Sequence, residues 1–444
     1  MLNGKKTVFS MLTMFLIVAA SSIGCAINIL QSTAEKSQDA VLDSQFLDYN
    51  ITIPDDYSTI QEGIDNAKPD DKILVRSGVY KETIEIKTSG IYLHGESKFN
   101  TTIDGEKTSK STITIFSPDV TVDGFSIING NGEKAPWDTA GVYILSSDVT
   151  IKDNLIKWNL LGINALDTAH NLTITYNSFT EDSIVLGNYE HTTNKFTKES
   201  FLHTITNNTI NGKPFYYFKN KENLIVPDDA GSVILANCTN ATIKDTYFTH
   251  VDFPVTLGFC NKCVIENITV ENTYGEIILL HSENCTIQDN TASHIIYGVC
   301  LDYESKNNIV RYNDLSNNYG GIVVMTSSSN NMVYQNDLHH NSYGIFLYNK
   351  SHNNTILENK IYDNAIGIKL QKTPYDNIIR NNTIRRCPVA AMSICRSKNT
   401  WDHNYYNRPH ILPKLIFSYR MIGKIPVPFF VTGFDLNPAV RPKI

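Results

Sequence analysis

The second half of the chain repeats one pattern of apolar and polar positions. Aliphatic residues form one column at Val264, Ile287, Val310, Val333, Ile356 and Ile379, and another at Ile278, Leu301, Val324, Leu347 and Leu370. Successive members of a column are 23 residues apart. Apolar positions also alternate locally, as at Ile345 and Leu347, and this period of two indicates strands with one face turned inward. Short strands that recur once per repeat predict a stack of coils with an aliphatic interior.

Glycines and asparagines keep the same period. Asparagine columns run through Asn267, Asn290, Asn313, Asn336, Asn359 and Asn382 and through Asn308, Asn331, Asn354 and Asn377, and a glycine column runs through Gly275, Gly298, Gly321, Gly344 and Gly367. We expect the asparagines to stand at the bends, where they bond to their copies above and below and adopt left-handed backbone. The repeat is too short for a strand–helix pair, so it predicts an all-β, right-handed parallel β-helix solenoid with 23-residue coils, about ten to twelve in number.

The N-terminus has the pattern of a targeting segment. Lys5 and Lys6 precede a mostly apolar run from Val8 to Ala20, and small residues lead to Cys25. This order is typical of a secretory signal. Residues 1–30 are predicted to be a signal peptide or a membrane anchor, with lipidation of Cys25 left open, and residues 31–50 a polar spacer. We expect an exported protein that is secreted, membrane-anchored or otherwise held at the cell surface.

The β-helix is predicted over residues 51–400, and its open ends need covers. The segment Ser58–Ala67 predicts a short amphipathic capping helix with Ser58 as its N-cap. Residues 401–444 abandon the repeat and predict a C-terminal capping tail. Its prolines favour an extended strap, which we expect to lie along the wall over an outward apolar strip formed by Ile277, Val323 and Phe346.

Several asparagines lie in Asn-x-Ser/Thr triplets. Asn267 belongs to the predicted interior column, so the pattern predicts that it is a poor acceptor for a sugar. Better acceptors, if the host glycosylates, are Asn100, Asn171, Asn207 and Asn353.

Motifs along the chain resemble a known family. The run Ile53–Tyr80 and the Leu93–Gly105 segment resemble the opening of NosD-type, pectin-lyase-like β-helix proteins. Residues 211–217 and 230–235 resemble the central segment of cell-surface members, and residues 404–409 and 434–442 the closing segment of archaeal members. The resemblance implies a parallel β-helix and a carbohydrate-related role, either binding sugars at the cell surface or cleaving polysaccharide. In the name-giving branch it implies a periplasmic accessory role in copper-site assembly.

The charge balance limits the partners. The net charge is −7 and no Lys/Arg block occurs, so nucleic acid is not expected as a partner. We expect a polysaccharide or cell-envelope glycan as partner, membrane contact through the N-terminal segment, and no cofactor. The favoured function is non-catalytic glycan or envelope binding. A polysaccharide lyase or glycoside hydrolase acting on the side wall and a copper or metal accessory protein are the alternatives.

One group of polar residues could carry chemistry. Glu276, His281 and Asp302 are the catalytic candidates, and Asp302, Tyr303 and Tyr348 are the candidates for carbohydrate binding. A spacing of 23 puts Glu276 in the interior column of Val299, where burial would raise its pKa and suit a general acid. The alternative is that the register slips by one at Glu276 and leaves it on the surface.

Four cysteines recur on neighbouring coils near one bend, at Cys238, Cys260, Cys263 and Cys285. Three interpretations stay open: buried thiols, disulfides in an exported protein, or a weaker alternative, a metal site. The pair His339-His340 stands alone on a predicted turn and gives copper little support.

Overall fold

We analysed a computed structural model of the chain. It describes residues 48–134, 139–188, 197–394 and 397–406, and the backbone of residues 414–422 and 425–435. The chain divides into a unit of residues 1–50 and a unit of residues 51–444, and the fold below is that of the second unit. The predicted signal or anchor lies outside the described residues. Among the described residues, no helix is long and apolar enough to span a bilayer.

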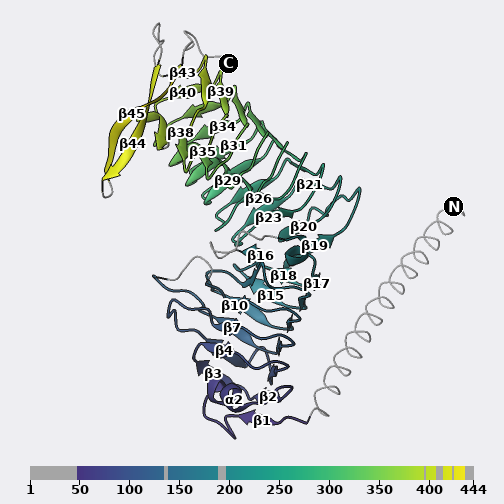
Figure 1. The fold of residues 1–444 in the computed structure, drawn as a ribbon. Coiled ribbons are helices and arrows are strands. Elements are labelled where there is room, and N and C mark those ends of the chain that lie inside the picture. The colour runs from purple at the N-terminus through teal and green to yellow at the C-terminus, as the bar shows by residue number, and fades with distance from the viewer. Residues whose placement is uncertain are drawn as a thin grey trace, which may run out of the picture. The chain divides into compact units, whose positions relative to one another are not determined.

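Three columns of parallel strands make a first stack of coils from Ile51 to Ile210 (Figure 1). The first column holds β1 (Ile51–Ile53), β2 (Lys72–Val75), β5 (Tyr92–Gly95), β8 (Thr121–Asp123), β11 (Thr150–Lys152), β14 (Thr173–Thr175) and β17 (Thr204–Thr206). The second holds β3 (Gly78–Lys81), β6 (Thr101–Asp104), β9 (Ser126–Ile128), β12 (Leu155–Lys157), β15 (Ser178–Thr180) and β18 (Thr209–Ile210). The third holds β4 (Ile84–Ile86), β7 (Ile113–Ile115), β10 (Val142–Ile144), β13 (Ile163–Leu166) and β16 (Ile184–Asn188).

A second stack runs from Lys213 to Tyr406 in three walls. Wall 1 holds β19 (Lys213–Lys219), β20 (Ser232–Ala236), β23 (Val255–Gly258), β26 (Ile277–Leu280), β29 (Tyr297–Asp302), β32 (Gly320–Val324), β35 (Tyr343–Tyr348), β38 (Ile366–Gln371) and β41 (Val389–Ile394). Wall 2 holds β21 (Thr242–Lys244), β24 (Val264–Glu266), β27 (Thr286–Gln288), β30 (Ile309–Arg311), β33 (Met332–Tyr334), β36 (Thr355–Leu357), β39 (Ile378–Arg380) and β42 (Thr400–Asp402). Wall 3 holds β22 (Tyr247–Thr249), β25 (Thr269–Glu271), β28 (Thr291–Ser293), β31 (Asp314–Ser316), β34 (Asp337–His339), β37 (Lys360–Tyr362), β40 (Thr383–Arg385) and β43 (Tyr405–Tyr406).

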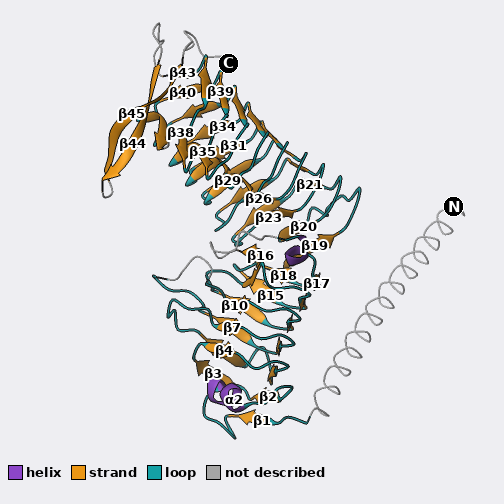
Figure 2. Ribbon diagram, in the orientation of Figure 1, coloured by secondary structure: helices purple, strands orange, loops and turns teal. Residues whose placement is uncertain are grey.

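The predicted right-handed parallel β-helix is confirmed. The described chain is almost entirely strand and loop, with α2 (Ile60–Asn66) and a 3-10 turn, η1 (Lys198–Phe201), as its helical elements (Figure 2). The solenoid has about 15 turns, more than the ten to twelve expected, which was too few for residues 51–400 at about 23 residues a coil.

The spacing of 23 holds from Ile287 to Ile379, but the steps just before and just after this range are 22 residues. Ile265, not Val264, pairs with Ile287, and Leu279, not Ile278, pairs with Leu301. The coil here has 22 residues, and side chains alternate faces along a strand. The columns predicted from a constant period of 23 are therefore wrong by one position at Val264, Asn267, Gly275 and Ile278.

Buried asparagines form ladders at the bends, as predicted. In one step, Asn313 Oδ1 accepts hydrogen bonds from the backbone N–H and the side-chain N–H of Asn290, at 3.1 and 2.9 Å. The ladders comprise Asn154, Asn177 and Asn208; Asn290, Asn313, Asn336, Asn359, Asn382 and Asn404; Asn308, Asn331, Asn354, Asn377 and Asn399; and Asn318, Asn341 and Asn364, a column the sequence analysis missed.

The left-handed backbone lies elsewhere than predicted. It falls on the residue before the ladder asparagine, such as Asp289 at φ 55° or Tyr312 at φ 57°. The ladder side chain points inward while its predecessor makes the turn and points out. Asn267 is one such exposed turn residue, so the interior position from which we predicted a poor sugar acceptor was wrong.

Helix α2 covers the first coil, as predicted. Ile60 and Ile64 are buried, and a Cβ on Gly63 would meet Ile53 Cδ1 at 2.7 Å. Its N-cap is Thr59 rather than Ser58, because the Thr59 hydroxyl accepts the N–H of Glu62 at 3.1 Å.

The end of the first stack meets the outer side of wall 1 of the second stack. β18 pairs antiparallel with β19, and β19 then starts wall 1. Outward side chains of wall 1, Ile234 and Leu280, share a hydrophobic cluster with Leu186 and Phe201 of the first stack. A Cβ on Gly258 would meet the Phe201 ring at 2.4 Å, so this glycine allows the close approach.

The C-terminal tail contains extended strands, as expected, and its course over the outward apolar strip stays a prediction. β44 (Lys414–Ile422) and β45 (Ile425–Asp435) form an antiparallel pair that joins β41 at Ser393–Ser418 and β42 at Trp401–Asp435 (Figure 1). The outward strip of wall 1 consists of Cys300, Val323 and Phe346, with Ile278 packed against it. Ile277 was wrongly assigned to this strip, because it belongs to the interior cluster.

Candidate functional site

A cavity of about 250 Å³ lies where β16 of the first stack faces the outer side of wall 1. We call it the junction cavity. Its lining residues are Val185, Leu186, Gly187, Phe253, Thr256, Glu276, Ile278, Leu280, Tyr297, Cys300, Asp302 and Met325. Two of the residues singled out in the sequence, Glu276 and Asp302, therefore meet in one enclosure.

Glu276 is neither in the interior nor on the open surface. Its neighbour Ile277 pairs with Val299, so the predicted interior position was wrong and the register does slip by one. Side chains of wall 1 at 276, 278 and 280 share the outward face, yet Glu276 is only 7% exposed because the first stack covers that face. Among the described residues, none donates a hydrogen bond to its carboxyl group.

Asp302 lies on the next coil, in the column of Leu280. It is 3% exposed, and its Oδ1 accepts the backbone N–H of Tyr303 at 2.7 Å. Met325 and Tyr348 follow it in the same outward column, as the sequence predicted. The cavity thus holds two carboxyl groups, against a floor of aliphatic and sulfur-containing side chains.

Burial shifts the pKa of both acids upward. Desolvation, with the charge of Asp302 second, raises the pKa of Glu276 to about 8. Desolvation also raises the pKa of Asp302 to about 6, against the lowering effect of hydrogen bonds from Thr326 and Tyr303. At neutral pH Glu276 is then mostly protonated and Asp302 mostly ionised, so one is a proton donor and the other an acceptor.

The other sequence candidates do not line the junction cavity. His281 stacks on Phe259 with ring centroids 4.8 Å apart and also contacts Tyr303 at 5.9 Å. Burial lowers the pKa of His281, and Tyr303 is 8% exposed. Tyr348 lies two coils from Asp302 beside Phe346. The structure therefore brings Glu276 and Asp302 together in the junction cavity, whereas His281, Tyr303 and Tyr348 are not among its lining residues.

The cysteines stack in two interior pairs, Cys238 above Cys260 and Cys263 above Cys285. All four are buried and free. The Cys260 thiol donates to the Leu235 carbonyl at 3.3 Å, and burial raises its pKa well above the usual value. In the structure these side chains act as small interior residues that satisfy backbone carbonyls.

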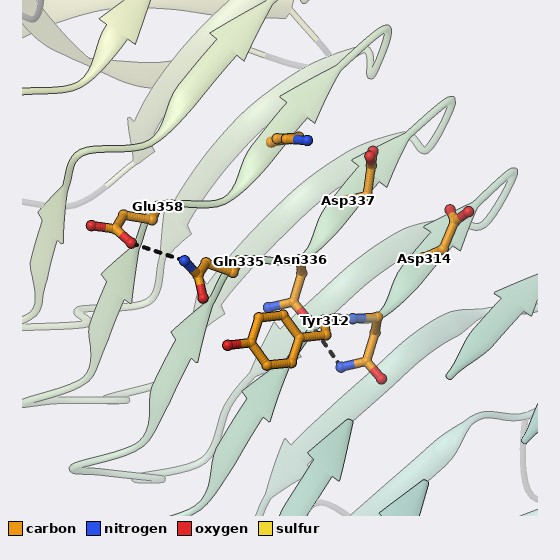
Figure 3. A pocket seen from close by; sticks show the side chains of 8 residues that line it. Tyr312, Asp314, Gln335, Asn336, Asp337 and Glu358 are labelled. Carbon is orange, nitrogen blue, oxygen red and sulfur yellow. Dashed lines mark hydrogen bonds between the residues drawn. The ribbon is translucent and has the colours of Figure 1, made fainter. Parts of the chain in front are cut away.

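A second, open pocket of about 440 Å³ lies at the bend between walls 2 and 3. We call it the wall pocket (Figure 3). Its lining residues are Tyr312, Asn313, Asp314, Gln335, Asn336, Asp337, Glu358 and Lys360. They come from three successive coils, so equivalent positions recur about every 4.8 Å along the stack.

The wall pocket forms because inward-pointing and outward-pointing side chains alternate at the bend. Tyr312, Gln335 and Glu358 are the left-handed turn residues that precede ladder asparagines, with φ of 57°, 55° and 54°. Their side chains therefore point out, and Gln335 donates to Glu358 at 3.2 Å (Figure 3). This site was not predicted from the sequence, although the 23-residue spacing of Asp314, Asp337 and Lys360 was a signal for it.

The first residues of β31, β34 and β37 form the other side of the wall pocket. Asp314, Asp337 and Lys360 pair in register. His339 contacts Asp314 at 3.0 Å and stacks on Tyr362 at 5.0 Å. With Glu358, the described lining has three carboxylates and one ammonium group, and it is polar and predominantly negative.

Comparison with known proteins agrees with this architecture. Residues 230–411 match the family model described as periplasmic copper-binding protein, NosD. The matched residues cover most of the second stack. No curated protein compared with the chain matches it.

Several solved structures match the chain at low identity and low TM-score. A mannuronan C-5 epimerase A-module from Azotobacter vinelandii is 14% identical over 81% of this chain and 93% of that chain, with a TM-score of 0.37. An exopolygalacturonase from Thermotoga maritima is 10% identical over 78% and 81%, with a TM-score of 0.37. The periplasmic alginate epimerase AlgG is 14% identical over 80% and 72%, with a TM-score of 0.27. These likenesses concern the fold alone.

Proposed function

We propose that this protein is an exported glycan-binding protein that holds a sugar chain in the wall pocket. The observation that carries the proposal is an exposed aromatic ring beside polar side chains that repeat from coil to coil. Tyr312 is 47% exposed at the pocket. A repeating array of donors and acceptors matches a polymer of repeating units.

The chemistry of the pocket suits sugar hydroxyl groups. Carboxylates and amide oxygens accept hydrogen bonds from hydroxyls, and the amide of Gln335 and the ammonium of Lys360 donate them. A tyrosine offers an apolar ring face at small cost in conformational entropy. The volume of about 440 Å³ lies within the range of about 300–1,000 Å³ typical of ligand pockets.

The charge of the pocket favours neutral glycans over polyuronates. Asp314, Asp337 and Glu358 outnumber Lys360, and like charges held close together repel. We therefore propose a neutral chain as ligand. Export is part of the proposal, and it is supported by the periplasmic family description and by the charged and apolar order of residues 5–25.

Binding assays on a polysaccharide panel test the proposal. Affinity electrophoresis or calorimetry should show binding to a neutral polymer and at least tenfold weaker binding to pectate or alginate at low salt. Tyr312→Ala should weaken binding, whereas Tyr176→Ala, at a left-handed turn of the first stack where the side chain is 59% exposed, should not. Stronger binding to polyuronates, or equal effects of the two variants, would contradict the proposal.

Cleavage at Glu276 and Asp302 is the second candidate. The observation that favours it is two buried carboxyl groups in one cavity, and their raised pKa values of about 8 and about 6 suit the pairing of an acid and a base. Their exposures of 7% and 3% argue against access by an intact polymer. Release of reducing ends or unsaturated uronates from the same panel, lost in Glu276→Gln, would establish cleavage instead of binding.

Copper, named in the family description, does not fit the described residues. Among them, no group of three or more His, Cys, Asp or Glu is placed to hold a metal ion. The stacked thiols donate to backbone carbonyls, and His339 and His340 contact each other through Nδ1 atoms at 2.9 Å. We therefore derive no copper chemistry from these residues.

A further inference from the structure

The junction cavity combines buried negative charge with an apolar lining. Glu276 and Asp302 are both more than nine-tenths buried, and Glu276 receives no hydrogen bond from any described residue. No Lys, Arg or His occurs among the described lining residues. A buried carboxylate without a countercharge is costly, so a ligand that brings a positive charge would supply what the described lining residues lack.

The walls of the cavity determine what kind of cation fits. Phe253 and Tyr297 are aromatic lining residues, and Met325 contributes a polarisable thioether. Aromatic faces attract organic cations within about 6 Å. A hard metal ion needs about six oxygen ligands, and no described group of three metal-ligating side chains is present.

We propose that the junction cavity binds a small organic ammonium ion between Glu276 and Asp302. The carbon substituents of the ammonium pack against Phe253, Tyr297 and Met325. A cavity of about 250 Å³ exceeds the roughly 150 Å³ that accommodates benzene, so a choline-sized or sugar-sized amine fits. None of the cavity's lining residues lines the wall pocket, and the inference is independent of the glycan proposal.

The charge of the site matches a monovalent cation at neutral pH. With a pKa of about 6 for Asp302 and about 8 for Glu276, the pair carries close to one negative charge at pH 7. Tyr274 and Cys300 face the same groups, and burial raises the pKa of Tyr274 to about 12 and that of Cys300 well above its usual value. Between pH 6 and pH 9 the charge therefore changes at the carboxyl pair.

Ligand pairs that differ only in charge test the proposal on the full chain. Choline and its carbon isostere 3,3-dimethylbutan-1-ol have the same shape, and glucosamine is compared with glucose. Calorimetry at pH 7 should show at least tenfold tighter binding for the charged member of one pair. Binding in the first pair identifies a free amine as the source, and binding in the second an amino sugar. Equal binding within both pairs, or none, would overturn the inference.

Variants of the junction cavity distinguish the contribution of charge to binding from that of shape. Asp302→Asn should weaken binding of the charged probe at least tenfold at pH 7. Glu276→Gln should bind like the wild type at pH 6 but clearly more weakly at pH 9, where the wild-type Glu276 is ionised. Thr256→Val, an uncharged change of similar size in the same cavity, should retain affinity within about threefold. Loss of binding in Thr256→Val with retention in Asp302→Asn would overturn the inference.

Discussion

Ser183 donates its backbone N–H to Oδ2 of Asp252 at 2.8 Å, although the two residues are 69 positions apart. Gly162 donates to the same oxygen at 2.9 Å. Asp252 is buried, and desolvation with the nearby charge of Asp182 raises its pKa well above the ordinary value. A protonated carboxyl group keeps one oxygen that accepts both bonds, so Asp252 joins the second stack to the first without burying a charge.

Replacing Asp252 should show that the acceptor oxygen matters and the charge does not. Asp252→Asn keeps an acceptor and should lower the free energy of unfolding by less than about 1 kcal/mol. Asp252→Leu leaves two buried N–H groups unpaired and should lower it by about 2–4 kcal/mol. Urea unfolding measures both. Equal losses in the two variants would show that the hydrogen bonds contribute little.

Stability should fall as the pH rises from about 4.5 to 8. Glu276 has a folded pKa of about 8 against an ordinary value of 4.5, and burial likewise raises the pKa of Asp182 to about 7. Over this window the folded state binds more protons than the unfolded state, so each group costs about 1.4 kcal/mol per pH unit until its folded pKa is reached.

Glu276→Gln measures the contribution of Glu276 to this pH dependence of stability. The variant cannot ionise, so it should match the wild type near pH 4.5 and be more stable at pH 8. Thermal or urea unfolding across this range gives the slopes. Parallel curves for variant and wild type would mean that the pKa of Glu276 is not raised.

Tyr312 pays a conformational cost that an asparagine would avoid. At φ 57° a bulky residue is strained, and Asn tolerates this region better. Tyr312→Asn should leave the melting temperature unchanged or raise it, with a gain of up to about 1 kcal/mol in the free energy of unfolding. The same variant should weaken glycan binding. Tyr176→Asn, at φ 58° before Asn177, should behave alike in stability without affecting binding. A stability loss of similar size at both turns would remove the reason to assign Tyr312 to a ligand.

Leu347 tests the interior register. It is fully buried in β35, so Leu347→Asp places an unpaired charge among aliphatic side chains and should cost about 4 kcal/mol or more. Ile378→Asp makes the same kind of change at a position that is 40% exposed and should cost less than about 1 kcal/mol. Circular dichroism melting compares the two. Wild-type melting of Leu347→Asp would contradict the register.

Removal of the C-terminal tail should expose an aggregation-prone apolar surface. Ending the chain before Pro409 removes β44 and β45, which pair with β41 and β42, and leaves open strand edges. We expect aggregation or strong binding of a hydrophobic dye while strand content persists. A soluble, monomeric truncation with unchanged dye binding would show that the tail covers nothing apolar.

The sequence by itself determined the coil, because its physics is local and repetitive. A side-chain period of two sets which face points inward, and identical spacing stacks identical side chains, as at Leu347 and Asn313. It also located the capping helix near Ile60 and the outward column of Asp302 and Tyr348. These features depend on neighbours one coil away, and those neighbours lie at a constant sequence distance.

Only the tertiary structure decided which side chains point inward where the number of residues per coil changes. One coil of 22 residues turned Glu276 outward and moved Asn267 off the ladder, since a shift of one residue reverses every face. The first stack then covered this outward face through contacts such as Gly162–Asp252, across 90 residues. Burial by a segment so distant in the sequence has no local signal. This burial encloses Glu276 with Asp302 and raises the pKa values of both carboxyl groups.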